Sequence, residues 1–222
     1  MKLILFDIDG TLISAGGAGI RSLEKAFNEI FSIKDAFKNL TLAGKTDLQI
    51  FKEGLNHYGI TESEGVLARI EGLYLQHLKG EINNNDKHVK AGIVPLLERL
   101  QGHYTVGLLT GNLLDGARIK LSSLNLWHYF EDGAYGSDLE DRVGLLPIAV
   151  ARFHKKTGIK FAYESCVVIG DTPRDVAASK CHGAKALAVA TGPYSYAQLL
   201  QTGADAVFED LSDTQAVIDF LA

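Results

Sequence analysis

The sequence predicts an α/β fold in which a mainly parallel, doubly wound sheet carries an inserted all-helical cap domain. Short apolar runs alternate with segments of helical periodicity along most of the chain, which is typical of parallel sheets covered by helices. One stretch breaks this alternation. From about residue 18 to residue 79, three helical patterns follow one another without a strand between them.

The predicted strands are short, continuous apolar runs, as expected for strands that are buried on both faces. They comprise residues 3–6, 105–109, 166–169, 186–189 and 206–208. The segments with helical periodicity in this part of the chain are residues 93–101, 117–124, 145–157, 174–182, 196–201 and 213–221. Because strands and helices alternate, we expect the strands to pair in parallel.

The helical stretch is predicted to form a domain of its own, inserted after the first strand. Apolar residues recur at three-and-four spacing in each of its three segments. Glycines bracket the stretch on both sides, and a polar connector follows it before the sheet resumes. We therefore assign residues 16–87 to the cap domain, and residues 1–15 and 88–222 to the core.

Composition and charge exclude several classes of protein. The net charge of −5, without a basic stripe, argues against a nucleic-acid partner. The first apolar run is too short to span a bilayer, and no signal-peptide pattern opens the chain. Cys166 and Cys181 form no C-x-x-C pair, and we expect both to be small buried residues. These observations favour a cytoplasmic protein without a membrane partner, and they leave the oligomeric state open.

Polar residues with functional potential gather where the predicted strands end. They are Asp7 and Asp9 after the first strand, Thr110-Gly111-Asn112 after the second, and Asp171 with Asp175 after a later one. In open parallel sheets, ligands bind beyond the carboxyl ends of the strands. Taken singly, each acidic residue could be a solvated loop residue or a helix cap, and Asp171 before Thr172-Pro173 has the pattern of an N-cap. Their joint placement favours one site.

The residue types fit a divalent cation beside a phosphate. Mg²⁺ prefers oxygen ligands and usually keeps some waters and a substrate oxygen, and Asp7 and Asp171 would supply two such oxygens. Without a metal, the repulsion between these carboxylates would raise at least one pKa. Thr110 and the backbone amides of Gly111 and Asn112 suit the oxygens of a phosphoryl group.

These segments resemble three motifs of the haloacid dehalogenase-like hydrolases. The matching segments, in order, are Asp7-Ile8-Asp9-Gly10-Thr11, Leu109-Thr110-Gly111-Asn112 and Gly170-Asp171-Thr172-Pro173-Arg174-Asp175. The helical insert is similar to that of the subgroup with an inserted helical cap, which includes phosphoglycolate phosphatase-like members. The resemblance covers essentially the whole chain and implies a Rossmann-like core, a Mg²⁺ cofactor and a phosphatase.

The resemblance also implies roles for the residues. Asp7 would be the nucleophile that forms an aspartyl-phosphate, and Asp9 would exchange the proton with the leaving oxygen and the attacking water. Asp7, Asp171 and the backbone carbonyl of Asp9 would hold the metal, with Asp175 supporting them from behind the direct ligands or through water. Haloacid dehalogenases, which attack carbon and need no metal, lack the residue corresponding to Asp9, so its presence favours phosphate chemistry.

The family's third motif departs from its usual form here. Most relatives have a lysine between the second and fourth motifs, whereas residues 137–147 contain only one basic residue, Arg142. We expect Arg142 to take the lysine's role with Thr110 at the phosphoryl oxygens, because a guanidinium keeps the charge and adds a planar fork. Lys155 and Lys156 lie too far along the next helix. The alternative is a surface arginine, with another residue in this role.

The cap and its substrate are less constrained by the sequence. Residues 42–47 are similar to a loop that points at the active site in phosphoglycolate phosphatase-like relatives. Lys45 is therefore expected to contact an anionic substrate, with a solvated lysine as the alternative. The leading hypothesis is a phosphatase that acts on a small phosphorylated metabolite. The alternatives are a sugar-phosphate mutase of the β-phosphoglucomutase type and a non-enzymatic signalling module that accepts phosphate on an aspartate.

Overall fold

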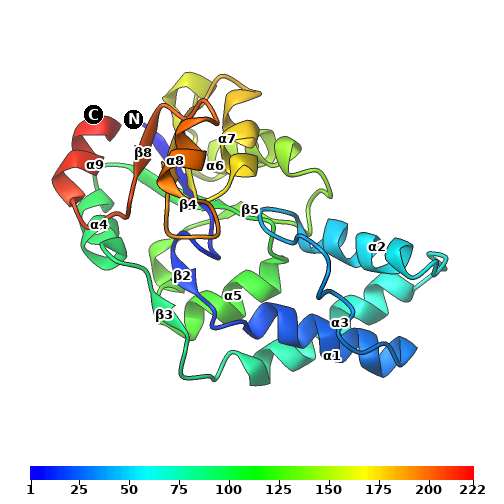
Figure 1. Ribbon diagram of the computed structural model, residues 1–222. Coiled ribbons are helices and arrows are strands. Elements are labelled where there is room, and N and C mark those ends of the chain that lie inside the picture. The colour runs from blue at the N-terminus through cyan, green and yellow to red at the C-terminus, as the bar shows by residue number, and fades with distance from the viewer.

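A six-stranded parallel sheet forms the centre of the computed structural model, which describes all residues from 1 to 222 (Figure 1). In sequence order its strands are β1 (Leu3–Phe6), β4 (Thr105–Leu109), β5 (Gly133–Ala134), β6 (Cys166–Gly170), β7 (Lys185–Val189) and β8 (Ala206–Phe208). In space they are ordered β5-β4-β1-β6-β7-β8, and every neighbouring pair is parallel. The first strand therefore lies between β4 and β6.

Helices cover both faces of the sheet. The helices α4 (Ile93–Leu100), α5 (Leu114–Ser122) and α9 (Thr214–Leu221) contribute to the apolar core on one face, and α6 (Leu145–Thr157), α7 (Pro173–Lys180) and α8 (Tyr196–Leu200) pack on the other. The alternation within β1 explains the two layers, because successive side chains of a strand point to opposite faces. Ile4 and Phe6 belong to the first core, whereas Leu3 and Leu5 pack with Phe153 of α6.

The cap consists of three helices with a hydrophobic core of their own. They are α1 (Ala18–Phe31), α2 (Asp47–His57) and α3 (Val66–Glu81), coloured from blue to cyan in Figure 1. Phe27, Phe37 and Phe51 are fully buried in this core. The chain passes between the sheet domain and the cap at a two-stranded antiparallel ribbon, β2 (Ile13–Ser14) and β3 (His88–Val89).

Most predicted elements form within a few residues of their expected bounds, and the α/β fold with a helical insert is confirmed. The strands β2, β3 and β5 were not predicted, because two residues show no periodicity. The N-cap of α7 is Thr172 and not Asp171, since Thr172 and Asp175 form a capping box. Cys166 is buried as expected, whereas Cys181 is exposed. No helix in the structure combines the length and apolarity that a membrane crossing requires.

Candidate active site

A cavity of about 640 Å³ lies beyond the carboxyl ends of β1, β4 and β6, with the cap on its other side. The chain continues from β1 into the cap and then into β4, whereas β6 follows on the other side of β1. Such a reversal of strand order opens a crevice at the sheet edge, which is where ligands bind in this class of fold. The cavity lining includes predicted site residues from both domains: Asp7, Asp9, Lys45, Gly111, Asn112, Arg142 and Asp171.

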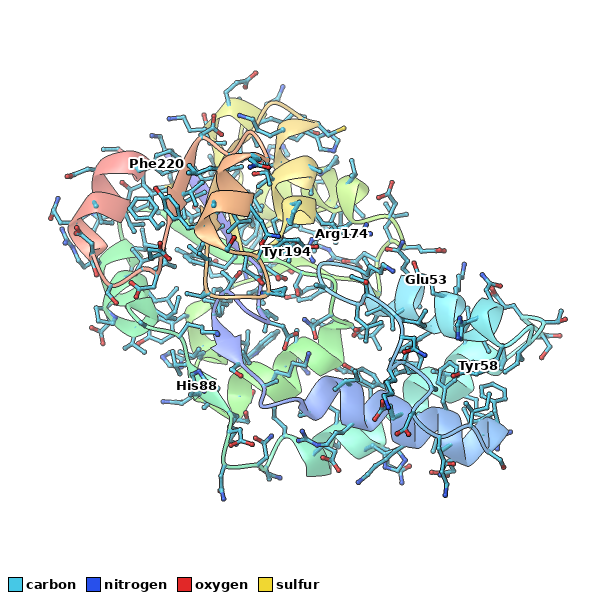
Figure 2. The ribbon with its side chains drawn as sticks, in the orientation of Figure 1. Glu53, Tyr58, His88, Arg174, Tyr194 and Phe220 are labelled. Atoms are coloured by element: carbon cyan, nitrogen blue, oxygen red, sulfur yellow. The ribbon has the colours of Figure 1, made fainter.

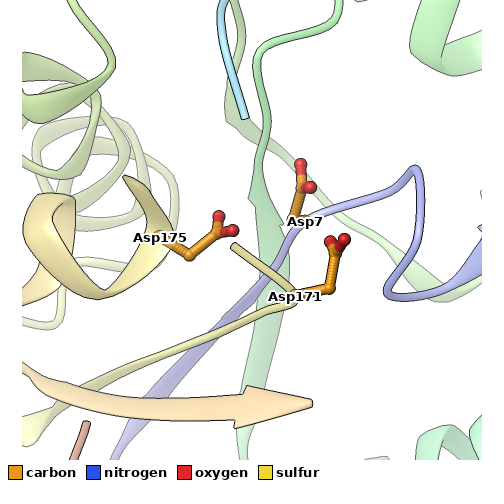
Figure 3. A group of neighbouring side chains, drawn as sticks. All are labelled: Asp7, Asp171 and Asp175. Atoms are coloured by element: carbon orange, nitrogen blue, oxygen red, sulfur yellow. The ribbon is translucent and has the colours of Figure 1, made fainter. Parts of the chain in front are cut away.

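Three aspartates lie close together beside this cavity, and two of them, Asp7 and Asp171, line it. Asp7 directly follows β1, Asp171 directly follows β6, and Asp175 lies in the first turn of α7. One carboxylate oxygen from each lies within 4.8 Å of the others, and Figure 3 shows the three side chains close together. All three residues are at least 96% buried, with exposures of 4%, 1% and 2%. The structure thus brings together three of the four aspartates that the sequence analysis assigned to a metal site, and the Asp9 side chain lies outside this group.

The chain after β1 is shaped to fit against Asp171. The hydroxyl of Thr11 donates a hydrogen bond to Oδ1 of Asp171 at 2.9 Å. Gly10 adopts a φ of 87°, which is the left-handed region that favours glycine, and a Cβ atom there would overlap the Asp171 carboxylate. Gly10 and Thr11 therefore allow the segment after β1 to pack closely against the segment that contains Asp171.

Burial of the cluster has an electrostatic cost. Loss of solvation raises the pKa of Asp7, an effect that Arg142 opposes and the neighbouring Asp175 increases. Loss of solvation also raises the pKa of Asp171, and the negative charges of Asp7 and Asp175 raise it further. Carboxylates confined this closely disfavour one another's ionised form. The site is therefore built to accept positive charge.

Arg142 supplies part of that charge and is buried, with an exposure of 5%. Its guanidinium Nη2 lies 3.0 Å from Oδ1 of Asp7 and also contacts Oδ1 of Asp175. Its Nη1 donates to the carbonyl of Gly44 in the cap at 3.2 Å, whereas Nε has no hydrogen-bond partner. Arg142 is thus not the surface arginine of the alternative interpretation, although contact with a phosphoryl group stays a prediction.

Asp175 uses both carboxylate oxygens within the protein. Oδ1 pairs with Arg142, and Oδ2 accepts hydrogen bonds from the Thr172 amide at 3.0 Å and from its hydroxyl at 2.7 Å. The capping box thereby anchors Asp175 while Asp175 orients the arginine. This arrangement favours an indirect role for Asp175 beside a metal, because both of its oxygens already have protein partners.

The Asp9 side chain lies outside the acidic cluster of Asp7, Asp171 and Asp175, in a different environment. Its carboxylate Oδ2 accepts hydrogen bonds from Lys120 Nζ at 2.6 Å and from Asn112 Nδ2 at 2.8 Å. The Asp9 side chain is 41% exposed, whereas that of Lys120 is 5% exposed. Two aspartates that are two residues apart thus receive distinct surroundings, which is how active sites separate the roles of similar groups.

Lys120 was not predicted as a site residue. It lies in α5, the helix that follows Asn112, on the same face as the buried Ala117 and Leu121. Helix side chains tilt toward the N-terminus, so this long side chain reaches back toward the end of β4. The only signal in the sequence is a lysine at an inward-facing helix position, and it becomes readable once the face of α5 is known.

The segment after β4 is present in the site, but its residues take different positions. Asn112 lines the cavity, and Thr110 lies fully buried behind it. The Thr110 hydroxyl accepts hydrogen bonds from the Asn112 amide at 3.3 Å and from Asn112 Nδ2 at 2.9 Å. Because the hydroxyl accepts twice, its own proton remains available for donation to a further oxygen.

The cap loop is docked directly on the core. The Asp47 amide donates to the carbonyl of Gly111 at 2.7 Å, and the Asp47 carboxylate accepts from the Leu113 amide at 2.9 Å. The Thr46 hydroxyl donates to the carbonyl of Glu140 at 2.7 Å and also caps α2 by accepting from Gln49. These hydrogen bonds show the cap closed over the site. Burial at this boundary raises the pKa of Asp47 to about 6.

Lys45 lines the cavity but is not a free cation, because its ammonium forms an ion pair with Glu53 of α2. Figure 2 shows Glu53 on the cap side and Arg174, at the start of α7, on the core side of the boundary between the two domains. Contact between Lys45 and an anionic substrate stays a prediction.

The acidic cluster has the donor chemistry of a magnesium site. All its donors are oxygens, and the backbone carbonyl of Asp9 accepts no backbone hydrogen bond, so it is available as a further oxygen ligand. Hard cations such as Mg²⁺ select such ligands and retain positions for water and substrate. The residues present therefore fit the metal that the sequence resemblance implies.

Solved structures similar to the chain share its fold. A hydrolase from Pseudomonas syringae is 23% identical, with a TM-score of 0.74 and 100% of each chain covered. A predicted phosphoglycolate phosphatase from Haemophilus somnus is 20% identical, with a TM-score of 0.73 and 98% of each chain covered. CbbY from Rhodobacter sphaeroides, in complex with phosphate, is 15% identical, with a TM-score of 0.77 and 96% of each chain covered.

Sequence comparison assigns the family. No functionally curated protein matches the chain. The model of a family described as haloacid dehalogenase-like hydrolases matches residues 1–183, which include all the predicted catalytic residues. The chain belongs to the haloacid dehalogenase-like hydrolase family.

Proposed function

We propose that the protein is a Mg²⁺-dependent phosphatase that hydrolyses a small phosphorylated metabolite through an aspartyl-phosphate intermediate. The observation that carries the proposal is the different placement of the two aspartates after β1. Asp7 lies in the acidic cluster beside Arg142, whereas Asp9 faces the same cavity outside that cluster. A nucleophile and a separate proton carrier are what two-step phosphoryl transfer requires.

Each site residue has a separate role in the proposed two-step reaction. Asp7 attacks the phosphorus atom, and the bond from phosphorus to the leaving oxygen breaks while Asp9 donates a proton to that oxygen. Water then attacks the phosphorus of the phosphoaspartate and transfers a proton to Asp9. The bond between phosphorus and the Asp7 oxygen breaks, which releases inorganic phosphate and restores the Asp7 carboxylate. Arg142 and Thr110 offset the charge that develops on the phosphoryl oxygens.

Asp7, Asp171 and the carbonyl of Asp9 would hold Mg²⁺, with Asp175 supporting them through water. When bound, the metal would offset the repulsion between the carboxylates and the phosphate. The closed cap would exclude bulk water from the cavity and contact the leaving group. Support for a small substrate comes from the cavity volume of about 640 Å³, part of which the phosphoryl group must occupy.

The proposal is tested by incubating the purified protein with a panel of phosphorylated metabolites, with and without Mg²⁺. We expect phosphate release that depends on Mg²⁺ and is lost in Asp7→Asn. Activity that survives both chelation and Asp7→Asn would contradict the mechanism. Slow phosphate release with fast formation of an isomeric phosphate ester would instead identify a sugar-phosphate mutase.

A further inference from the structure

Lys120 is a buried cation that the mechanism above does not use. Burying an ammonium group is costly unless acceptors replace its water, so a lysine that is 4% exposed needs specific partners. Lys120 has two, the Asp9 carboxylate at 2.6 Å and Oδ1 of Asn112 at 2.6 Å. Burial alone would lower the pKa of Lys120, but the negative charges of its neighbours, Asp9 foremost, raise it above its ordinary value.

The contacts distinguish the two oxygens of Asp9. Oδ2 accepts from both Lys120 and Asn112, and Asn112 is itself held by Lys120 and by the Thr110 hydroxyl. Oδ1 of Asp9 has no hydrogen-bond partner in the chain, and Asp9 lines the cavity. One oxygen is therefore fixed by two donors, and the other is left without a protein partner in a residue that lines the cavity.

We propose that Lys120 is a positioning residue for proton transfer, which together with Asn112 fixes Oδ2 of Asp9 so that Oδ1 exchanges the proton with the leaving oxygen. This inference rests on the proposed phosphatase function and assigns a role to a residue outside the four sequence motifs. Fixing a proton donor in place contributes to the rate only where the leaving oxygen needs the proton. The role therefore predicts a dependence on the leaving group.

The test compares kcat/KM for two phosphate monoesters in wild type and in Lys120→Met. The methionine side chain has a similar length to that of lysine but no charge. A simple alkyl phosphate has a poor leaving group and needs protonation, whereas dinitrophenyl phosphate does not. We expect kcat/KM for the alkyl ester to fall by about 10²–10⁴-fold, the usual contribution of general acid catalysis, and that for the aryl ester by less than about tenfold. Asp9→Asn should show the same pattern.

The controls separate positioning from folding. Arg118→Met removes an exposed cation from the same helix and should leave the ratio of the two kcat/KM values unchanged. If Lys120→Met does not fold, as judged by its thermal unfolding transition, Lys120→Gln is measured instead, with the same expected pattern. Equal losses on both esters, in whichever variant folds, would overturn the inference. Failure of wild type to hydrolyse either ester would instead reject the proposed function.

Discussion

At the scale of single residues, the site depends on how a few buried charges are paired. Arg142 touches two aspartates of the cluster, and Asp175 is held in turn by the capping box of α7. The sequence could identify Arg142 because no other cation occurs between residues 137 and 147. It could not identify Lys120, since a helix with two cations near its end does not reveal which one turns inward.

Replacing Arg142 by Ala should lower kcat by about 10²–10³-fold, because the phosphoryl oxygens lose a fixed donor and two buried carboxylates lose their cation. Lys155→Ala is the matched control, since this lysine is exposed on α6 and should change kcat less than about twofold. The kcat of Arg142→Lys should lie between those of the other two variants, because lysine keeps the positive charge but lacks the planar guanidinium with its paired donors. Steady-state kinetics check all three, and equal small losses would contradict the assignment of Arg142.

At the scale of elements, strand ends and helix starts bring the motifs together. Continuous apolar runs identified the long strands because these are buried on both faces, and the carboxyl ends of parallel strands must share one edge. The sequence could not show how the cap docks. Docking depends on hydrogen bonds to backbone groups of the core. The Asp47 amide donates to the carbonyl of Gly111, and the Asp47 carboxylate accepts from the amide of Leu113, just before α5. No pattern of side chains in the sequence encodes these contacts.

Asp47 should therefore affect closure of the cap. We expect Asp47→Ala to raise KM roughly tenfold, because a hydrogen bond to a charged group contributes about 1.5–3 kcal/mol and here stabilises only the closed state. Glu64→Ala, an exposed cap residue outside the interface, is the control. Small-angle scattering should show a larger radius of gyration for Asp47→Ala alone. An unchanged KM and radius would show that Asp47 does not hold the cap closed.

At the scale of the whole molecule, the acidic cluster links stability to pH. Asp7 and Asp171 have pKa values raised above the ordinary 3.8, so the folded metal-free protein binds protons that the unfolded chain has released. This extra proton binding stabilises the folded state. The stabilisation is fully present below pH 3.8, the ordinary pKa, and is lost as the pH rises through the raised pKa values of the folded protein. Each pKa unit of difference corresponds to about 1.4 kcal/mol.

The metal-free wild type should therefore lose stability relative to Asp171→Asn as the pH rises from the acidic range to neutrality. Asparagine keeps an acceptor for the Thr11 hydroxyl but carries no charge, so the difference isolates the cluster. Mg²⁺ should raise the unfolding temperature of wild type increasingly as pH rises, because ligands must be deprotonated to bind it. Thermal unfolding across pH measures both effects. Parallel curves for the two proteins would contradict the electrostatic account.

The central claim is that Asp7 forms a covalent bond to phosphorus. Rapid acid quenching during turnover, followed by mass spectrometry of the intact chain and its peptides, tests it most directly. We expect a fraction of wild-type chains to gain the mass of one phosphoryl group, located on Asp7, and none of the Asp7→Asn chains to do so. Phosphate release by wild type with no phosphorylated chain at any quench time, or with the group on another residue, would contradict the claim.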